Sequence, residues 1–298
     1  MFSSSLSYSD DCLFSGNVTV ALFPNLAAST CQYILEHAEA KMVVLGKLDA
    51  KDWNVMKAGV PDGIPTVGMP MAPTDGSATY DSWESIQAKT TALTEPPHRA
   101  PDDEALIVYT SGSTGQPKGV VHTFQTISYP SKLMSKLYHF NRNDRYLSYL
   151  PLAHVMDRWL GLCCSLYNGY QVFFAESLTT FVQDLNRARP TLFISVPRLW
   201  LKFQLGVYAK KDPKTVNFLL KIPLVKKVVA KKILQTLGLD SVRLAGTGSA
   251  PIPQEVVEWY RTLGLSLLEG YGMSENFCYS HNTIKGMEKP GFVVRIVS

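Results

Sequence analysis

Short apolar runs alternate with longer amphipathic segments along most of this chain, and this alternation constrains the fold more than any other feature. The apolar runs are rich in β-branched and aromatic side chains, as is typical of strands buried on both faces. They lie at residues 42–45, 105–109, 145–150, 171–174, 191–196, 242–245 and 266–268. The alternation predicts an α/β fold with parallel-sheet layers covered by helices.

Apolar residues recur at helical spacing between most of these runs. The predicted helices lie at residues 26–40, 122–138, 154–167, 178–188 and 254–263. Residues 59–104 are instead rich in Pro, Gly, Thr and Asp, which predicts a long surface excursion. Ligands of such sheets bind at the carboxyl ends of the strands, so we expect the functional residues in the loops that follow the apolar runs.

The composition excludes several classes of protein. Hydrophobic residues make up 46% of the chain and charged residues 18%, which excludes an intrinsically disordered protein. The five cysteines form no Cys-x-x-Cys pair, so we expect reduced thiols in a cytoplasmic protein rather than a disulfide framework or a zinc site. The first 17 residues lack the basic start of a signal peptide.

Positive charge is concentrated in one segment, residues 210–232, which holds eight lysines and one acid, Asp212. The rest of the chain has 21 basic and 24 acidic residues, so we do not expect binding to nucleic acid. Apolar residues are interleaved with the lysines, which allows peripheral contact between residues 210–232 and an anionic membrane. The alternative, which the pattern favours slightly, is a solvated helix pair with one buried apolar side.

The sequence Tyr109-Thr-Ser-Gly-Ser-Thr-Gly-Gln-Pro-Lys-Gly-Val-Val121 directly follows one of the apolar runs. Glycines let backbone N–H groups approach a ligand, hydroxyls add donors, and Lys118 adds positive charge, so the segment suits a polyphosphate. It is not a Walker A loop, because Lys118 lies between Pro117 and Gly119. A flexible linker is the ordinary alternative, but linkers do not normally join a buried strand to a helix. The expected phosphate-binding residues are Thr110, Ser111, Gly112, Ser113, Thr114, Gly115 and Lys118.

This segment and three later ones, in the same order, resemble the signatures of the adenylate-forming enzymes, which include acyl-CoA synthetases, firefly-type luciferases and peptide-synthetase adenylation domains. Tyr149-Leu-Pro-Leu-Ala-His-Val-Met-Asp-Arg158 is similar to a segment of the long-chain acyl-CoA synthetase branch. Thr247-Gly-Ser-Ala-Pro251 resembles the family's adenine-pocket turn, and Glu269-Gly-Tyr-Gly-Met-Ser-Glu275 resembles its Gly-Tyr-Gly-x-Thr-Glu motif. The resemblance extends from about residue 18 to residue 292.

The resemblance implies a ligase that uses ATP, Mg²⁺ and CoA to convert a long-chain fatty acid first to acyl-AMP and then to acyl-CoA. It implies that Lys118 holds the departing pyrophosphate, Glu275 ligates Mg²⁺, Ser274 donates to the α-phosphate and His154 positions the fatty carboxylate. Gly246 and Thr247 are expected in the acyl pocket. The implied adenine-binding residues are Gly248, Ser249, Ala250, Glu269, Gly270, Tyr271 and Gly272.

Some of these residues also have ordinary structural explanations. A histidine in an apolar stretch, such as His154, is often a core or capping residue, and Tyr271 could simply pack. Small residues such as Gly246 and Thr247 suit a plain turn. Asp157 stands where the family has Glu, one methylene longer, so any bond that Asp157 makes to Arg158 is expected to differ.

The resemblance also implies a domain organisation. Residues 1–17 are expected to be a leader that does not match the family, residues 18–298 part of the family's N-terminal domain, and the C-terminal domain absent. We therefore expect weak nucleotide binding and little turnover from the chain alone, located in the cytoplasm or peripherally on a membrane. Two alternatives remain: another carboxylate-activating adenylation enzyme, such as an acyl–carrier-protein ligase, and an inactive nucleotide-binding remnant.

Overall fold

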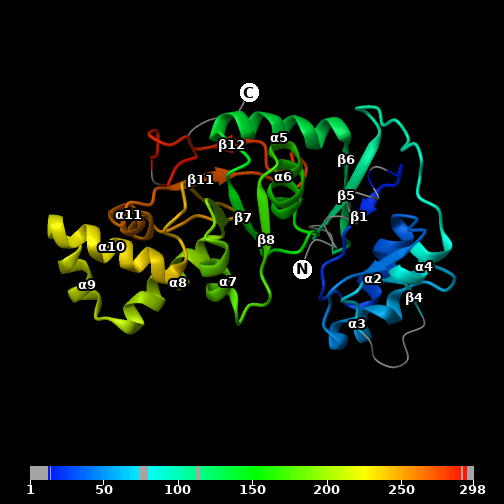
Figure 1. Cartoon of the computed structure of the whole chain (residues 1–298), viewed down its shortest axis with the longest axis horizontal. Coiled ribbons are helices and arrows are strands. Elements are labelled where there is room, and N and C mark those ends of the chain that lie inside the picture. Colours follow the sequence, from blue (N-terminus) through cyan, green and yellow to red (C-terminus); the bar gives the residue numbers. More distant parts are fainter. Residues whose placement is uncertain (1–12, 14, 74–79, 112–114, 290, 294–298) are drawn as a thin grey trace. The chain divides into compact units, whose positions relative to one another are not determined.

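The computed structural model describes residues 13, 15–73, 80–111, 115–289 and 291–293, and the chain divides into two compact units. Unit 1 runs to Ile127 and also contains Leu150–Val155, whereas unit 2 contains Ser128–Tyr149 and the chain from Met156 onward. Figure 1 labels the elements of both units, each of which has its own sheets and core.

Unit 1 contains two three-stranded sheets. In the first, β5 (Glu104–Thr110) pairs in parallel with β1 (Thr19–Val20) and antiparallel with β6 (Lys118–Thr123). The second sheet is parallel and consists of β2 (Val43–Leu45), β3 (Thr66–Gly68) and β4 (Asp81–Ser82).

Within the described residues, short helices accompany these sheets, among them α2 (Ala28–His37), α3 (Ala50–Met56), the 3₁₀ helix η1 (Lys57–Gly59) and α4 (Trp83–Lys89). The prediction of a surface excursion over residues 59–104 was wrong in part, since β3, β4 and α4 lie within it. Strands of two or three residues are too short to leave a periodic pattern in the sequence.

Unit 2 is built on a six-stranded sheet in the order β12-β11-β10-β9-β7-β8, parallel except for β12. Five of its strands begin within two residues of the starts of predicted apolar runs, which confirms the predicted α/β class. The strands are β7 (Arg145–Ser148), β8 (Gln171–Phe174), β9 (Leu192–Ser195), β10 (Leu244–Thr247), β11 (Leu267–Tyr271) and β12 (His281–Asn282).

Helices cover both faces of this sheet. Successive side chains of a strand point to opposite faces. On β7, Leu147 joins the large core cluster with α7, α8 and α11, whereas Tyr146 on the other face reaches Asp157 in the π-helix η2. The helices are α5 (Phe124–Tyr138, which begins in unit 1), η2 (Asp157–Cys164), α6 (Ser165–Asn168), α7 (Phe181–Ala188), α8 (Pro197–Lys210), α9 (Pro213–Leu219), α10 (Pro223–Leu237) and α11 (Gln254–Thr262).

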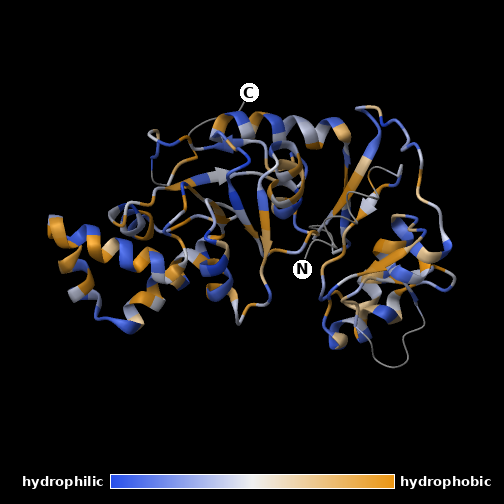
Figure 2. Ribbon diagram, viewed as in Figure 1, coloured by the Kyte–Doolittle hydropathy of each residue, from blue (hydrophilic) through white to orange (hydrophobic). Residues whose placement is uncertain are grey.

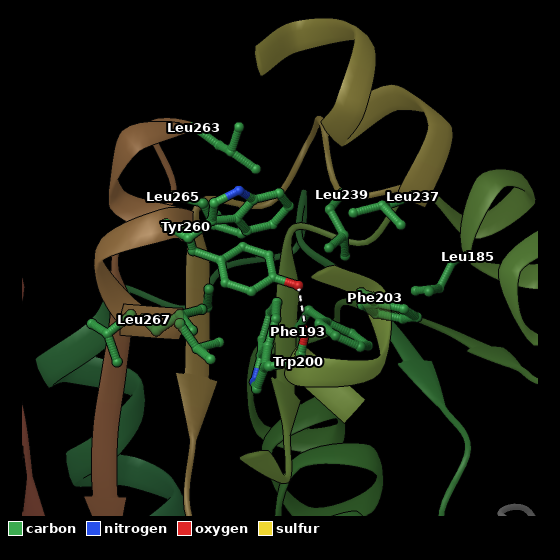
Figure 3. Close-up of a cluster of buried hydrophobic side chains, with 14 of the residues drawn as sticks. Leu185, Phe193, Trp200, Phe203, Leu237, Leu239, Tyr260, Leu263, Leu265 and Leu267 are labelled. Carbon is green, nitrogen blue, oxygen red and sulfur yellow. Dashed lines mark hydrogen bonds between the residues drawn. The ribbon is translucent and has the colours of Figure 1, made fainter. Parts of the chain in front are cut away.

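The core of unit 2 is centred on aromatic side chains (Figure 3). The Trp200 ring meets the rings of Phe193 and Tyr260 edge to face, at centroid distances of 5.2 and 4.9 Å. The buried Tyr260 hydroxyl donates to the carbonyl oxygen of Trp200 at 2.8 Å, which satisfies the hydroxyl. Phe193 lies on β9, Trp200 on α8 and Tyr260 on α11, so this arrangement fixes α8 and α11 to the sheet.

The segment after β5 differs from its prediction. Residues 118–123 form the antiparallel strand β6, and the helix begins at Phe124 rather than near His122. The register pairs Ile107 with Val121 and Val108 with Val120, so β-branched side chains meet across the two strands. Within the described residues, no helix is long and apolar enough to cross a membrane.

Candidate active site

The segment predicted to bind phosphate is the loop of a β-hairpin in unit 1. Thr110, the last residue of β5, pairs with Lys118, the first residue of β6, so the antiparallel pairing of the two strands continues up to both ends of the loop. Lys118 is exposed, and Gly115 has a φ of +91°, which favours glycine. Gly112, Ser113 and Thr114 lie outside the described residues. The hairpin therefore presents a lysine at a fixed backbone position beside a loop rich in hydroxyls.

His154 lies in unit 1 in a tight turn, where its backbone N–H donates to the carbonyl oxygen of Pro151 at 2.8 Å. Burial lowers the pKa of the His154 imidazole. The ring is therefore neutral at pH 7, with one nitrogen able to donate and the other able to accept a hydrogen bond.

The segments 246–250 and 269–275 lie side by side in unit 2. The parallel register pairs Gly246 with Leu268 and Thr247 with Glu269, so β10 and β11 end together. A Cβ atom at Gly248 would lie 2.8 Å from the carbonyl oxygen of Gly270, closer than packed atoms tolerate. These glycines therefore allow two backbone segments to touch at the carboxyl edge of the sheet.

Buried polar atoms at this edge have no hydrogen-bond partner within the described part of the chain. They include Oγ1 of Thr247, at the end of β10, and Nδ2 of Asn282, on β12. The two residues flank Gly270: its Cβ position would lie 3.2 Å from Oδ1 of Asn282 and 4.0 Å from the carbonyl oxygen of Thr247. Buried donors and acceptors are normally paired, so unpaired ones at a strand end indicate a place for a polar ligand.

A hydrogen-bonded turn follows β11. The backbone N–H of Met273 donates to the side chain of Asn276 at 2.9 Å, and the backbone N–H of Phe277 donates to the carbonyl oxygen of Ser274 at 3.2 Å. Glu275 is exposed at the tip of this turn. The Tyr271 side chain is 51% exposed, and its ring meets that of His281 edge to face at 5.9 Å. The turn thus presents a carboxylate and an open aromatic face at fixed positions.

Two of the predicted ligand-binding residues also have a structural role. Oε1 of Glu269 accepts a hydrogen bond from the backbone N–H of Gly291 at 2.9 Å. The carbonyl oxygen of Gly246 accepts one from the Trp200 indole at 3.2 Å, which ties β10 to α8. Asn282 and His281 were not predicted, because a two-residue strand after the Glu275 turn carries no motif that marks it.

Asp157 is fully buried at the start of η2. Its Oδ1 accepts a hydrogen bond from the Tyr146 hydroxyl at 2.7 Å, and its Oδ2 accepts one from the Ser148 hydroxyl at 3.2 Å. The short Asp side chain thereby ties η2 to β7.

The predicted residues thus fall into two groups. Unit 1 holds the hairpin loop with Lys118, together with His154, and unit 2 holds the paired edge of β10 and β11 with Ser274 and Glu275. Among the described residues, no three His, Cys, Asp or Glu side chains cluster as a metal site. A lone exposed carboxylate such as Glu275 still fits Mg²⁺ that arrives with a polyphosphate, because protein sites commonly give that ion only one or two carboxylates.

Comparison with known proteins agrees with the four motifs. A family model described as AMP-binding enzyme matches residues 12–296. A long-chain-fatty-acid–CoA ligase (ACSBG2) of Rattus norvegicus is 26% identical over 91% of this chain and 46% of its own length. Long chain acyl-CoA synthetase 3 of Arabidopsis thaliana is 28% identical over 89% of this chain and 45% of its own length. The chain thus spans about half the length of the curated relatives it matches.

Solved structures share the fold. An anthranilate CoA ligase, AuaEII, in complex with anthranoyl-AMP has a TM-score of 0.76 at 19% identity, and the match covers 97% of this chain and 52% of that one. An ATP-bound chimera, RpMatB-BxBclM B3, has a TM-score of 0.71 at 23% identity, covering 98% and 52%. At these identities the likeness shows the fold alone. With the family model matching nearly the whole length, the chain belongs to the AMP-binding enzyme family.

Proposed function

We propose that this chain carries the nucleotide-binding and carboxylate-activating site of a long-chain acyl-CoA ligase. The observation that supports this most is the paired edge of β10 and β11, where Gly248 and Gly270 touch and the buried Thr247 hydroxyl has no hydrogen-bond partner among the residues that the structure describes. Such an edge suits a flat ring that lies against the backbone, as an adenine would. The curated relatives named as long-chain ligases support the choice of acid.

The proposed reaction has two steps. A carboxylate oxygen of the fatty acid attacks the α-phosphorus of ATP, the bond from this phosphorus to the bridging oxygen breaks, and pyrophosphate leaves. The CoA thiolate then attacks the acyl carbon of acyl-AMP, and the bond from this carbon to the AMP oxygen breaks. The first step brings one anion to another, so electrostatic stabilisation must carry most of its catalysis.

The hairpin loop of unit 1 has the chemistry to hold the polyphosphate. Lys118 is exposed at the start of β6, where its ammonium group would bind β- and γ-phosphate oxygens and then the pyrophosphate. The hydroxyls and glycines of residues 110–115 would supply further donors. The positive charge of Lys118 would stabilise the negative charge of the leaving pyrophosphate.

In unit 2, the turn after β11 has the chemistry to bind an adenine and an α-phosphate. The exposed face of Tyr271 would pack on the adenine against the backbone of residues 248–250. The Ser274 hydroxyl would donate to the α-phosphate. Glu275 would hold Mg²⁺, which would draw charge from the phosphate oxygens when bound.

His154 would position the fatty carboxylate. Burial keeps its imidazole neutral at pH 7, so the ring would donate one hydrogen bond to a carboxylate oxygen without forming an ion pair. A neutral donor holds the carboxylate in place and leaves it nucleophilic. Gly246 and Thr247 would lie along the acyl chain.

The test measures how tightly the chain binds acyl-sulfamoyl adenosines, stable mimics of acyl-AMP, by isothermal titration calorimetry. We expect the palmitoyl mimic to bind much more tightly than the benzoyl mimic, since each buried methylene contributes about 0.8 kcal/mol, roughly fourfold in affinity. The substitution Tyr271→Ala should weaken binding of every mimic. The control Tyr167→Ala changes a tyrosine of similar exposure on α6 and should have no effect.

Each contrary outcome identifies the part of the proposal that fails. No binding of any mimic would contradict a nucleotide site and favour an inactive remnant. Equal binding of palmitoyl and benzoyl mimics would contradict the long-chain substrate and favour another adenylation enzyme. Equal losses of affinity in Tyr271→Ala and Tyr167→Ala would contradict the proposal that the adenine packs on Tyr271.

A further inference from the structure

The helix α10 buries one face in the core of unit 2. Ala230 and Leu237 are buried in the large cluster, and Val229, Ile233 and Leu234 pack partly buried against it. The helix ends at Leu237 and is capped by Gly238, whose Cβ position would lie 2.7 Å from backbone atoms of Leu185 and Asn186, so no side chain fits there. The fold of unit 2 therefore accounts for this face and for the end of the helix.

The opposite face of α10 also carries apolar side chains, although it does not pack against the core. Leu224 and Val228 are four residues apart and so lie on the same side of the helix. They are 82% and 71% exposed. A single exposed aliphatic residue is ordinary, but two on one helical face, directed away from the core, require an explanation.

Lysines surround this apolar pair. Lys227 follows Leu224 by three residues, and Lys231 and Lys232 follow Val228 by three and four, so all three flank the pair on the helix surface. All three lysines are exposed. No acidic residue occurs between Asp212 and Asp240, so the segment that contains α10 carries only positive charge. We call Leu224, Lys227, Val228, Lys231 and Lys232 the α10 outer face.

The neighbouring helix repeats the pattern. α9 buries Val216 in the same cluster and exposes Phe218 by 64%, with Lys214 four residues earlier on the Phe218 side. Figure 2 shows hydrophobic and hydrophilic residues alternating along α9 and α10. Both helices thus combine a buried face with an exposed one that mixes large apolar side chains and lysines.

We propose that the α10 outer face docks on the surface of an anionic lipid bilayer. Interfacial helices combine aliphatic side chains, which enter the acyl boundary, with lysines, which bind anionic headgroups. A protein partner fits less well, since protein interfaces are depleted in lysine and enriched in aromatic residues, Met and Arg. The inference does not rest on the proposed ligase activity, because it uses neither the nucleotide edge nor the hairpin loop.

Vesicle sedimentation of the chain tests the proposal without ATP or fatty acid. We expect binding to phosphatidylcholine vesicles that contain phosphatidylserine, weaker binding at high salt, and little binding to pure phosphatidylcholine. The double variant Lys231→Gln/Lys232→Gln should weaken binding about tenfold or more, as two lysines near an anionic surface warrant. The variant Leu224→Gln/Val228→Gln should also weaken it, with the lysines in place.

Matched controls separate this surface from general charge and hydrophobicity. Lys132→Gln/Lys136→Gln removes the same charge from exposed positions on α5, and Leu93→Gln/Leu178→Gln replaces two aliphatic residues exposed elsewhere. Both controls should bind as the unchanged chain does. As a second readout, anionic vesicles should protect the lysines of α10 from trypsin in the unchanged chain. No sedimentation with anionic vesicles at low salt, or equal losses in the control variants, would overturn the proposal.

Discussion

The paired edge of β10 and β11 and the hairpin loop after β5 both carry family motifs, yet the chain builds them by different physical means. At the strand edge, a Cβ atom at Gly248 would lie 2.8 Å from a backbone oxygen, and one at Gly272 would lie 2.7 Å from Cα of Cys278. At the hairpin, Lys118 is exposed. The edge depends on close packing, whereas the loop offers charge and donors. Substitutions at the strand edge should therefore alter stability, and substitutions in the hairpin loop should alter ligand affinity.

The largest expected effect is that of Gly272→Ala. The new methyl group would meet the backbone of Cys278, which cannot move aside as a side chain can, so we expect the free energy of unfolding to fall by about 3 kcal/mol. Urea denaturation measures the change. The control Gly206→Ala, on α8, has no described atom within 4 Å of its Cβ position and should be neutral or slightly stabilising. If Gly272→Ala lowered the free energy of unfolding no more than Gly206→Ala does, the packing explanation would be contradicted.

The second prediction concerns Lys118→Ala in the hairpin loop. Loss of a charge-assisted bond to phosphate should weaken Mg·ATP binding about 30-fold, equivalent to about 2 kcal/mol, as calorimetry would measure. Stability should change by less than about 0.5 kcal/mol because the side chain is exposed. Lys89→Ala, at an exposed position in the same unit, is the control. Unchanged ATP binding in Lys118→Ala would remove the loop from the proposed site.

The same contrast explains how far the sequence predicted the molecule. Long apolar runs such as 105–109 predicted their strands, because burial on both faces leaves a continuous signal. The run 242–245 predicted its strand two residues early, since Gly246 and Thr247 continue β10 in register with Ile194 and Ser195. Small residues carry no hydrophobic signal, so pairing with a neighbouring strand decided the boundary.

The sequence indicates candidate site residues only where the residues that carry the chemistry are close together along the chain. The motifs that end at Lys118 and Glu275 indicate a ligand through charge and glycine spacing within a few residues. The amide nitrogen of Asn282, which has no hydrogen-bond partner among the described residues, acquires its significance only through the neighbouring Gly270, twelve residues away along the chain and adjacent in the sheet. The antiparallel pairing that creates this neighbour is a tertiary property, which sequence spacing does not show.

The third prediction uses pH and the buried carboxylate of Asp144. Burial raises its pKa, but hydrogen bonds from Arg243, Thr191 and the Asn141 backbone outweigh burial and hold the pKa below its ordinary value. A lowered folded-state pKa contributes stability above the unfolded-state pKa and loses it as pH falls through the folded-state value. Asp144→Asn should therefore cost about 2 kcal/mol at pH 7 and progressively less as pH falls below about 4, because the native carboxylate becomes protonated as the pH approaches its lowered folded-state pKa.

Measurement of unfolding free energy across this pH range tests the third prediction. The control is Asp240→Asn, whose carboxylate pairs at 2.8 Å with the largely exposed Arg189 and should lose no more than about 1 kcal/mol. A difference between Asp144→Asn and the unchanged chain that stayed constant below pH 4 would show that the carboxylate charge is not what stabilises this position.

The smallest effect, that of Thr247→Val, separates stability from ligand binding within the packed edge itself. The Thr247 hydroxyl is buried without a partner in the described structure, so replacing it with a methyl group should raise stability by about 0.5–1 kcal/mol. The matched change Thr191→Val removes a hydroxyl that donates to Asp144 at 2.7 Å and should lower stability by about 1–2 kcal/mol. If the Thr247 hydroxyl is left unpaired for a ligand, the same variant should bind acyl-sulfamoyl adenosine several-fold more weakly. A gain in stability together with a loss of affinity in Thr247→Val would mean that this closely packed edge keeps one polar group for the ligand. A loss of stability in Thr247→Val would contradict that interpretation.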